Sequence, residues 1–100
     1  MNILPVMLIL FGADFPICSE TNHQNTPVAL FENNQYYAFW QDARFLTTQY
    51  KYALCAARVA KNGTVIDPDG KVIYSDSAAG IIDAAYDGSN FLVVFRDPNC

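Results

Sequence analysis

The stretch DAAYDGSNFLVVFRD (residues 83–97) decides the fold, because it aligns without a gap on VALFENNQYYAFWQD (residues 28–42), 55 positions earlier. In each copy an acidic residue closes one apolar run, two turn-forming residues follow, and a longer aromatic run begins. The two-residue turns are Asn33-Asn34 and Gly88-Ser89. Asn tolerates a positive φ and Gly adopts it freely, which a two-residue hairpin turn requires. The repeat therefore predicts one β-hairpin in each copy.

The second strand of each predicted hairpin is apolar at nearly every position. Residues 36–40 read YYAFW and residues 91–95 read FLVVF, with Trp40 and Phe95 at corresponding places. A strand that is solvated on one face alternates apolar and polar residues, so a continuous apolar run indicates burial on both faces. We therefore expect both runs to be covered on both sides.

Further strands are expected between the hairpins, at residues 51–60, 64–66 and 72–74. Asn62-Gly63 is a two-residue turn signal, and the sequence DPDG (residues 67–70) places Pro and Gly where a β-turn prefers them. Residues 51–60 also fit an amphipathic helix, because four of their side chains recur at helical spacing: Tyr52, Cys55, Ala56 and Val59. We favour a strand, because turns on both sides and a repeat of hairpins are consistent with one sheet.

These segments resemble the repeat of secreted, mostly bacterial, β-propeller-like proteins. The similarity rests on residues 85–97, on Asp42 and Arg44 after Trp40, and on residues 57–70, and it covers residues 27–100. It implies a fold of stacked four-stranded blades, in which inner strands are buried on both faces. Because its motifs belong to turns and cores, it implies no catalytic residue. Three departures bear on the turns and on the aromatic positions: Asn33 against Gly88, Trp40 against Phe95, and Arg44 against Asn99.

The fold class expected from these observations is all-β, with a four-stranded antiparallel blade-like repeat in an incomplete propeller-like array. Residues 27–80 form the first repeat, and residues 81–100 form the opening hairpin of a second one. A β-sandwich is the alternative architecture, although its strands alternate more cleanly.

The N-terminus carries an unbroken apolar run, residues 3–11. A membrane-spanning helix needs about 20 such residues, so the run is too short to span a bilayer and fits the core of a signal peptide. We expect a signal peptide over residues 1–19, cut after Ser19 or alternatively after Ala13, and an exposed linker over residues 20–26. The protein would then be secreted or periplasmic. The alternative is that the run is a buried first strand of a globular domain.

Composition limits the partners. The chain has 100 residues, a net charge of −4 and only six Lys and Arg residues, which form no cluster. Nucleic-acid binding depends on clustered basic residues, so no nucleic-acid partner is expected. No membrane span is expected either. Strands with two apolar faces need neighbours, so the partners we expect are further repeats or other copies of the chain.

Acidic residues offer the first candidate site. Asp67, Asp69 and Asp76 have the oxygen ligands that Ca²⁺ prefers. The spacing lacks the distal Glu of a calcium-binding hand, and turn chemistry already explains residues 67–70. Asp42 and Arg44 could hold a ligand at a blade edge, but a local ion pair or turn hydrogen bond is the better interpretation.

The remaining reactive side chains suggest no catalytic group. His23 lies in the polar linker with no third group to hold it as a base. Cys18, Cys55 and Cys100 have no metal-site spacing; Cys18 would leave with the signal peptide, and Cys55 is expected in the core. We therefore predict no catalytic, cofactor-binding or metal-binding residue.

Three functions remain open at this point. The first is a noncatalytic extracellular binding or structural repeat segment, the default for this architecture. The second is a noncatalytic piece of a secreted propeller enzyme. The third is a truncated fragment without activity.

Overall fold

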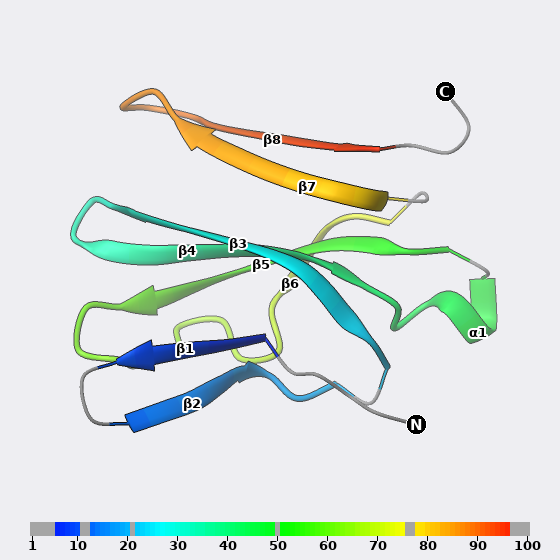
Figure 1. Ribbon diagram of the computed structural model, residues 1–100, viewed down its shortest axis with the longest axis horizontal. Coiled ribbons are helices and arrows are strands. Elements are labelled where there is room, and N and C mark those ends of the chain that lie inside the picture. The colour runs from blue at the N-terminus through cyan, green and yellow to red at the C-terminus, as the bar shows by residue number, and fades with distance from the viewer. Residues whose placement is uncertain (1–5, 11–12, 21, 50, 76–77, 97–100) are drawn as a thin grey trace.

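The computed structural model describes all residues except 1–5, 11–12, 21, 50, 76–77 and 97–100. It consists of three β-sheet layers stacked on one another (Figure 1). A four-stranded antiparallel sheet forms the middle layer, with one two-stranded hairpin on each side of it. The expected four-stranded antiparallel sheet is therefore confirmed.

The outer hairpins come from the two ends of the chain. The N-terminal one is β1 (Val6–Leu10) and β2 (Ala13–Cys18), and the C-terminal one is β7 (Ala79–Tyr86) and β8 (Phe91–Arg96). The central sheet has the order β3 (Gln24–Glu32), β4 (Gln35–Asp42), β5 (Ala53–Ala60) and β6 (Lys71–Tyr74). A single helical turn, α1 (Leu46–Gln49), joins β4 to β5.

Local sequence explains the central sheet. Asn33 and Asn34 have φ angles of 52° and 63°, so both occupy the left-handed region that a tight hairpin turn needs. Gly63, with φ of 95°, closes the turn after β5. The strand prediction for residues 51–60 is confirmed over Ala53–Ala60, and the helical alternative is wrong there. Val65 makes only an isolated bridge to Val59, so residues 64–66 are not a full strand.

The two hairpins that the sequence alignment predicts have the same register next to their turns, and beyond the register shift their pairing differs by one residue. Phe31 pairs with Tyr36 in the first hairpin, and Tyr86 pairs with Phe91 in the second, again 55 positions later. Both hairpins also have a register shift farther from the turn, between Asn25 and Val28 and between Ala79 and Asp83. In both, the residue opposite this shift is an aromatic one, Trp40 or Phe95. The turns lie where the sequence predicts them.

Two apolar cores fill the spaces between the layers. Alternate residues of β4 belong to different cores: Ala38 and Trp40 lie in the one on the β1–β2 side, with Ile17 and Cys18. Phe39 lies in the one on the β7–β8 side; its other members include Leu54, Ile82, Phe91, Val93 and Phe95. The expectation that residues 36–40 are buried on both faces is met by Ala38, Phe39 and Trp40, which are each 5% exposed or less.

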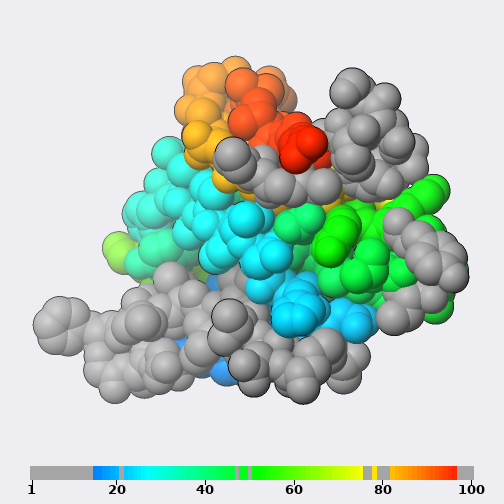
Figure 2. All heavy atoms as spheres, turned by 45° about the vertical axis from the view of Figure 1, so that its right-hand side comes forward, coloured from blue at the N-terminus to red at the C-terminus, as the bar shows by residue number. Residues whose placement is uncertain are grey.

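The same expectation is wrong for residues 91–95. Their exposure alternates, with Leu92 66% and Val94 50% exposed while Phe91, Val93 and Phe95 pack inward. The physical reason is that no described layer covers the outer side of β8 (Figure 2). Both faces of β8 are apolar, but among the described residues only the inner face is covered by another sheet.

Residues expected as signal peptide and linker take part in this arrangement. Ile17 and Cys18 are buried under the central sheet, and β3 begins at Gln24, a buried residue within the expected linker. The apolar run itself contributes the strand β1, and a strand there is part of what the alternative implies. Cleavage after Ser19 remains a prediction about processing.

The turn at residues 67–70 packs closely against the core. Gly70 has φ of +77°, and a Cβ placed there would lie 2.5 Å from the Trp40 ring. We expect Gly70→Ala to lower the free energy of unfolding by about 2–3 kcal/mol, from backbone strain plus overpacking. Gly88→Ala is the matched control: its φ is +106°, with nothing within 4 Å of the added Cβ, so only strain remains. Equal losses in urea titrations of the two variants would contradict this account.

Candidate functional site

The most connected polar group of the described residues is the Asp42 carboxylate, at the end of β4. It is fully buried and accepts a hydrogen bond from Trp40 Nε1 at 2.9 Å. Arg44 binds it with its Nε and one terminal nitrogen, each at 3.0 Å, and with its backbone N–H at 2.8 Å. This is a bidentate ion pair. The local ion pair expected for Asp42 and Arg44 is confirmed.

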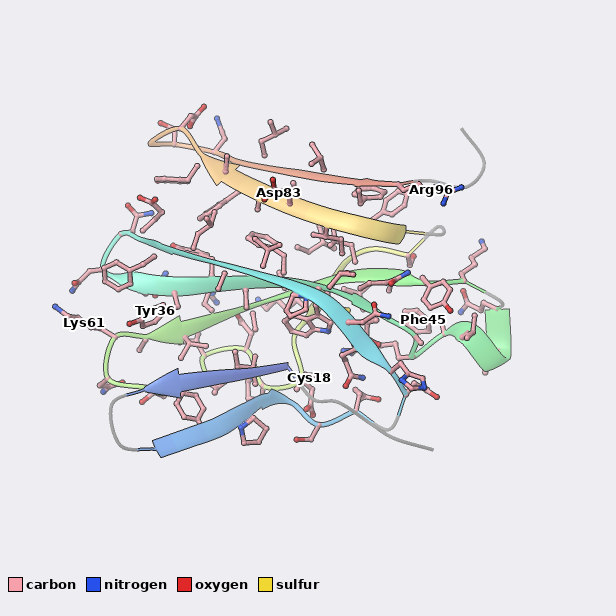
Figure 3. The ribbon with its side chains drawn as sticks, viewed as in Figure 1. Cys18, Tyr36, Phe45, Lys61, Asp83 and Arg96 are labelled. Carbon is pink, nitrogen blue, oxygen red and sulfur yellow. The ribbon has the colours of Figure 1, made fainter. Side chains whose placement is uncertain are left out.

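The Arg44 guanidinium also contacts residues outside β4 and the turn that follows it. Arg44 donates to the backbone oxygen of Asp69 at 2.6 Å and lies 3.9 Å from Cys18 Sγ. Figure 3 shows Cys18 where the N-terminal hairpin meets the central sheet. The ion pair thus joins β4, the turn at residues 67–70 and β2.

The two described cysteines, Cys18 and Cys55, are buried and unreactive thiols. Burial raises the pKa of the Cys18 thiol, and burial raises the pKa of the Cys55 thiol to about 12. A thiol acts as a nucleophile only as its thiolate, so both remain protonated and unreactive at neutral pH. Cys55 is a core residue, as the sequence predicts.

A second ion pair fixes the start of the turn at residues 67–70. The Asp67 carboxylate accepts hydrogen bonds from the Arg58 side chain at 2.9 and 3.1 Å and from its backbone N–H at 2.9 Å. Lys71 Nζ lies 3.6 Å away. The hydrogen bonds from Arg58 lower the pKa of Asp67 to about 2.

The Asp67 shift predicts a pH dependence. A carboxylate whose pKa is lower in the folded state stabilises the fold above the unfolded pKa of about 3.9, and this stabilisation is lost as the pH falls toward 2. We expect the thermal midpoint of the native chain to exceed that of Arg58→Gln at pH 6, and this difference to be much smaller at pH 2. A difference as large at pH 2 as at pH 6 would show that Arg58 acts through packing alone.

Two of the acidic residues that the sequence suggested as a calcium site have other partners in the structure. Asp67 is occupied by Arg58 and Lys71, and Asp69 Oδ1 accepts the backbone N–H of Ser19 at 2.9 Å. Asp76 lies outside the described residues. Within the described part of the chain, no group of three or more His, Cys, Asp or Glu side chains could hold a metal ion.

The other sequence candidates have simple positions. His23 is exposed, and its backbone oxygen accepts a hydrogen bond from the Ala43 N–H at 2.9 Å. Cys100 lies outside the described residues. No helix found in the described ranges is long and apolar enough to cross a membrane.

A groove lies beside the C-terminal hairpin, over the part of the central sheet that the hairpin leaves uncovered. It has a volume of about 220 Å³ and an apolar floor, and Phe91 forms its border with the hairpin. Ile73, on β6, is 54% exposed at its side. The groove exists because the two strands of β7–β8 cover only part of the four-stranded sheet. Its remaining lining includes Tyr37, Phe39, Ala56, Arg58, Asp67 and Lys71.

Sequence reasoning missed two parts of these contacts. Trp40 and Asp42 are two residues apart on a strand and so share a face, a signal that could have suggested their hydrogen bond. The burial of Cys18 under the sheet had no comparable signal, because it depends on contacts distant in the sequence. No family model, curated protein or solved structure matches this chain.

Proposed function

We propose that this chain is a noncatalytic, exported repeat segment of a propeller-like array, whose role is to supply sheet faces for packing against further units. One observation carries the proposal: the two hairpins share turn position, the register next to the turn and direction of stacking. In each, the same alternate positions of the second strand face the preceding layer: Tyr36, Ala38 and Trp40 in β4, and Phe91, Val93 and Phe95 in β8.

The candidate site also favours a structural role. The charged side chains of the two ion pairs are bound to one another, and the two described thiols are protonated. Catalysis requires a nucleophile or base that can reach a substrate. The surface also exposes large apolar side chains, among them Ile73, Leu92 and Val94, and sheet edges. Such faces and edges are binding surfaces for other β-structure.

A chain lengthened by one unit tests this function. Inserting a second copy of residues 24–78 after Ala78 adds 55 residues and keeps the repeat in phase. The inserted unit should fold, giving an unchanged circular-dichroism signal per residue and a steeper urea dependence of unfolding, because that slope follows the surface exposed.

The control carries the same insertion with Tyr37→Asp and Phe39→Asp in the inserted copy, which places charges in the interface between units. That copy should lose its protection from amide hydrogen exchange. An unmodified insert that exchanges as an unfolded chain would contradict the proposed function.

Export is tested separately. We expect N-terminal sequencing of secreted material to find Glu20 as the first residue. An intact Met1 on folded protein would contradict the expected signal peptide.

A further inference from the structure

The outer face of the C-terminal hairpin is exposed, and it corresponds to a face of the central sheet that is covered. Leu92 and Val94 correspond to Tyr37 and Phe39, 55 positions earlier. In the central sheet those two positions lie under β8, where Tyr37 and Phe91 have ring centroids 4.4 Å apart and Phe39 and Phe91 5.7 Å. The chain therefore shows what covers such a face: the inward side of a following hairpin.

The central sheet has a face that corresponds to the inward side of β8. It is the face opposite to the one that the C-terminal hairpin covers. There Tyr36, Ala38 and Trp40 occupy the positions that Phe91, Val93 and Phe95 occupy in β8. In the intact chain this face is covered by the N-terminal hairpin, with Ile17 and Cys18 packed against it. One molecule thus carries both halves of a stacking interface, of which one half is exposed and the other is covered.

The N-terminal hairpin is attached without strand pairing to the central sheet. Among the described residues, β1 and β2 pair only with each other, so removing them breaks no hydrogen-bond ladder of the central sheet. The hairpin is held by the apolar packing of Ile17 and Cys18 and by polar contacts. The polar contacts include Asp69 N–H to the Ile17 oxygen at 3.0 Å, Ser19 N–H to Asp69 Oδ1 at 2.9 Å and the weak contacts of Cys18 Sγ.

We propose that the N-terminal hairpin blocks head-to-tail association, and that its removal lets the Tyr36–Ala38–Trp40 face of one copy stack on the Leu92–Val94 face of another. This inference rests on the proposed function, because it uses the equivalence of the two hairpins. The partner is a second copy of this chain, chosen because the contact would repeat one that the chain already makes between β4 and β8. A contact between two different faces produces rings or open filaments rather than closed dimers.

Asp83 adjusts the strength of this contact. It lies on the outer face of β7 at the position that Val28 occupies in β3, and it is exposed. Stacking would bring this carboxylate against the apolar face of the next copy, which costs free energy. Replacing it with the residue of the first copy, Asp83→Val, should strengthen association.

The test uses the full chain with a protease site introduced between Ser19 and Asn22 and with Cys100→Ser. Before cutting, we expect a monomer in sedimentation velocity and no labelling of Cys55 by a thiol reagent. After cutting, the hairpin should dissociate and the trimmed chain should sediment as assemblies of several copies. Cys55 should be labelled in dilute trimmed chain and protected again as assembly proceeds, since it lies on the uncovered face.

Two variants and one mixture make the test specific. Leu92→Glu should abolish assembly of the cut chain without changing the fold of the uncut one, because Leu92 is exposed there. Asp83→Val should lower the concentration at which assembly begins. Adding uncut chain should shorten the assemblies, because it offers the Leu92–Val94 face but keeps its other face covered.

Three results would overturn the proposal: a hairpin that stays bound after the cut, a trimmed chain that stays monomeric or loses its β-sheet signal, or assembly that Leu92→Glu does not affect. If the lengthened chain folds as one unit while the cut chain stays monomeric, only this inference fails. If the inserted unit does not fold, the proposed function fails as well.

Discussion

Asp42→Ala is expected to remove most of the stability of the chain at 25 °C. The substitution removes the acceptor of the Trp40 indole N–H and leaves the guanidinium of Arg44, which is 15% exposed, without its counter-charge. Breaking a buried ion pair by removing one partner costs about 3–5 kcal/mol. Small domains have only about 5–15 kcal/mol of total stability, and a chain this short is expected near the lower end.

The measurement is a urea titration followed by circular dichroism. The control is the double variant Asp42→Leu with Arg44→Met, because replacing both members of a buried pair with apolar residues is often close to neutral. Arg44→Met alone should resemble Asp42→Ala, since it leaves the buried carboxylate unpaired. A loss of less than about 1 kcal/mol for Asp42→Ala would place this pair with ordinary surface ion pairs and contradict the account.

Trp40→Ala is expected to cost about 3–5 kcal/mol, the usual range for removing a large aromatic side chain from a core. Trp40 is fully buried and packs in the core between the central sheet and the N-terminal hairpin, below Gly70. The substitution also leaves Asp42 without one donor.

Phe95→Ala is the matched control, because Phe95 occupies the corresponding position of the second hairpin. Phe95 is only partly buried, packing against Tyr74 with ring centroids 4.9 Å apart. It should cost about 1–2 kcal/mol, in proportion to the apolar area it buries. Equal losses for Trp40→Ala and Phe95→Ala would mean that the two hairpins are equally covered.

The sequence predicts the hairpins and turns of this fold well, for a local reason. Asn33-Asn34 and Asn62-Gly63 specify tight turns through their own backbone preferences, and the strands beside them follow. Gly88, at the corresponding position of the second hairpin, has a positive φ as well. For these turns the structure and the expectation agree in position.

What the sequence does not predict depends on contacts between distant segments. The apolar run at the N-terminus has the length and composition of a signal peptide, and nothing within it indicates that Ile17 and Cys18 lie against Trp40 and Cys55. Likewise, residues 91–95 resemble a strand covered on both faces, and only the arrangement of layers shows that Leu92 and Val94 are exposed. The pairing of Asp42 and Arg44 was predictable because they are neighbours in sequence, but its burial was not.

The C-terminal hairpin stacks on the central sheet with Phe91 and Phe95 turned toward it, the orientation that the alignment of the two hairpins predicts. Nuclear Overhauser effects in an isotopically labelled sample of the full chain measure this directly. We predict contacts from the Phe91 ring to Tyr37 and from the Phe95 ring to Tyr74, whose centroids lie 4.4 and 4.9 Å apart. Contacts from the methyl groups of Leu92 and Val94 to Tyr37 or Phe39 would instead show the hairpin turned over, because a one-residue slip exchanges the two faces of a strand. That result would contradict the equivalence of the two hairpins and the stacking built on it.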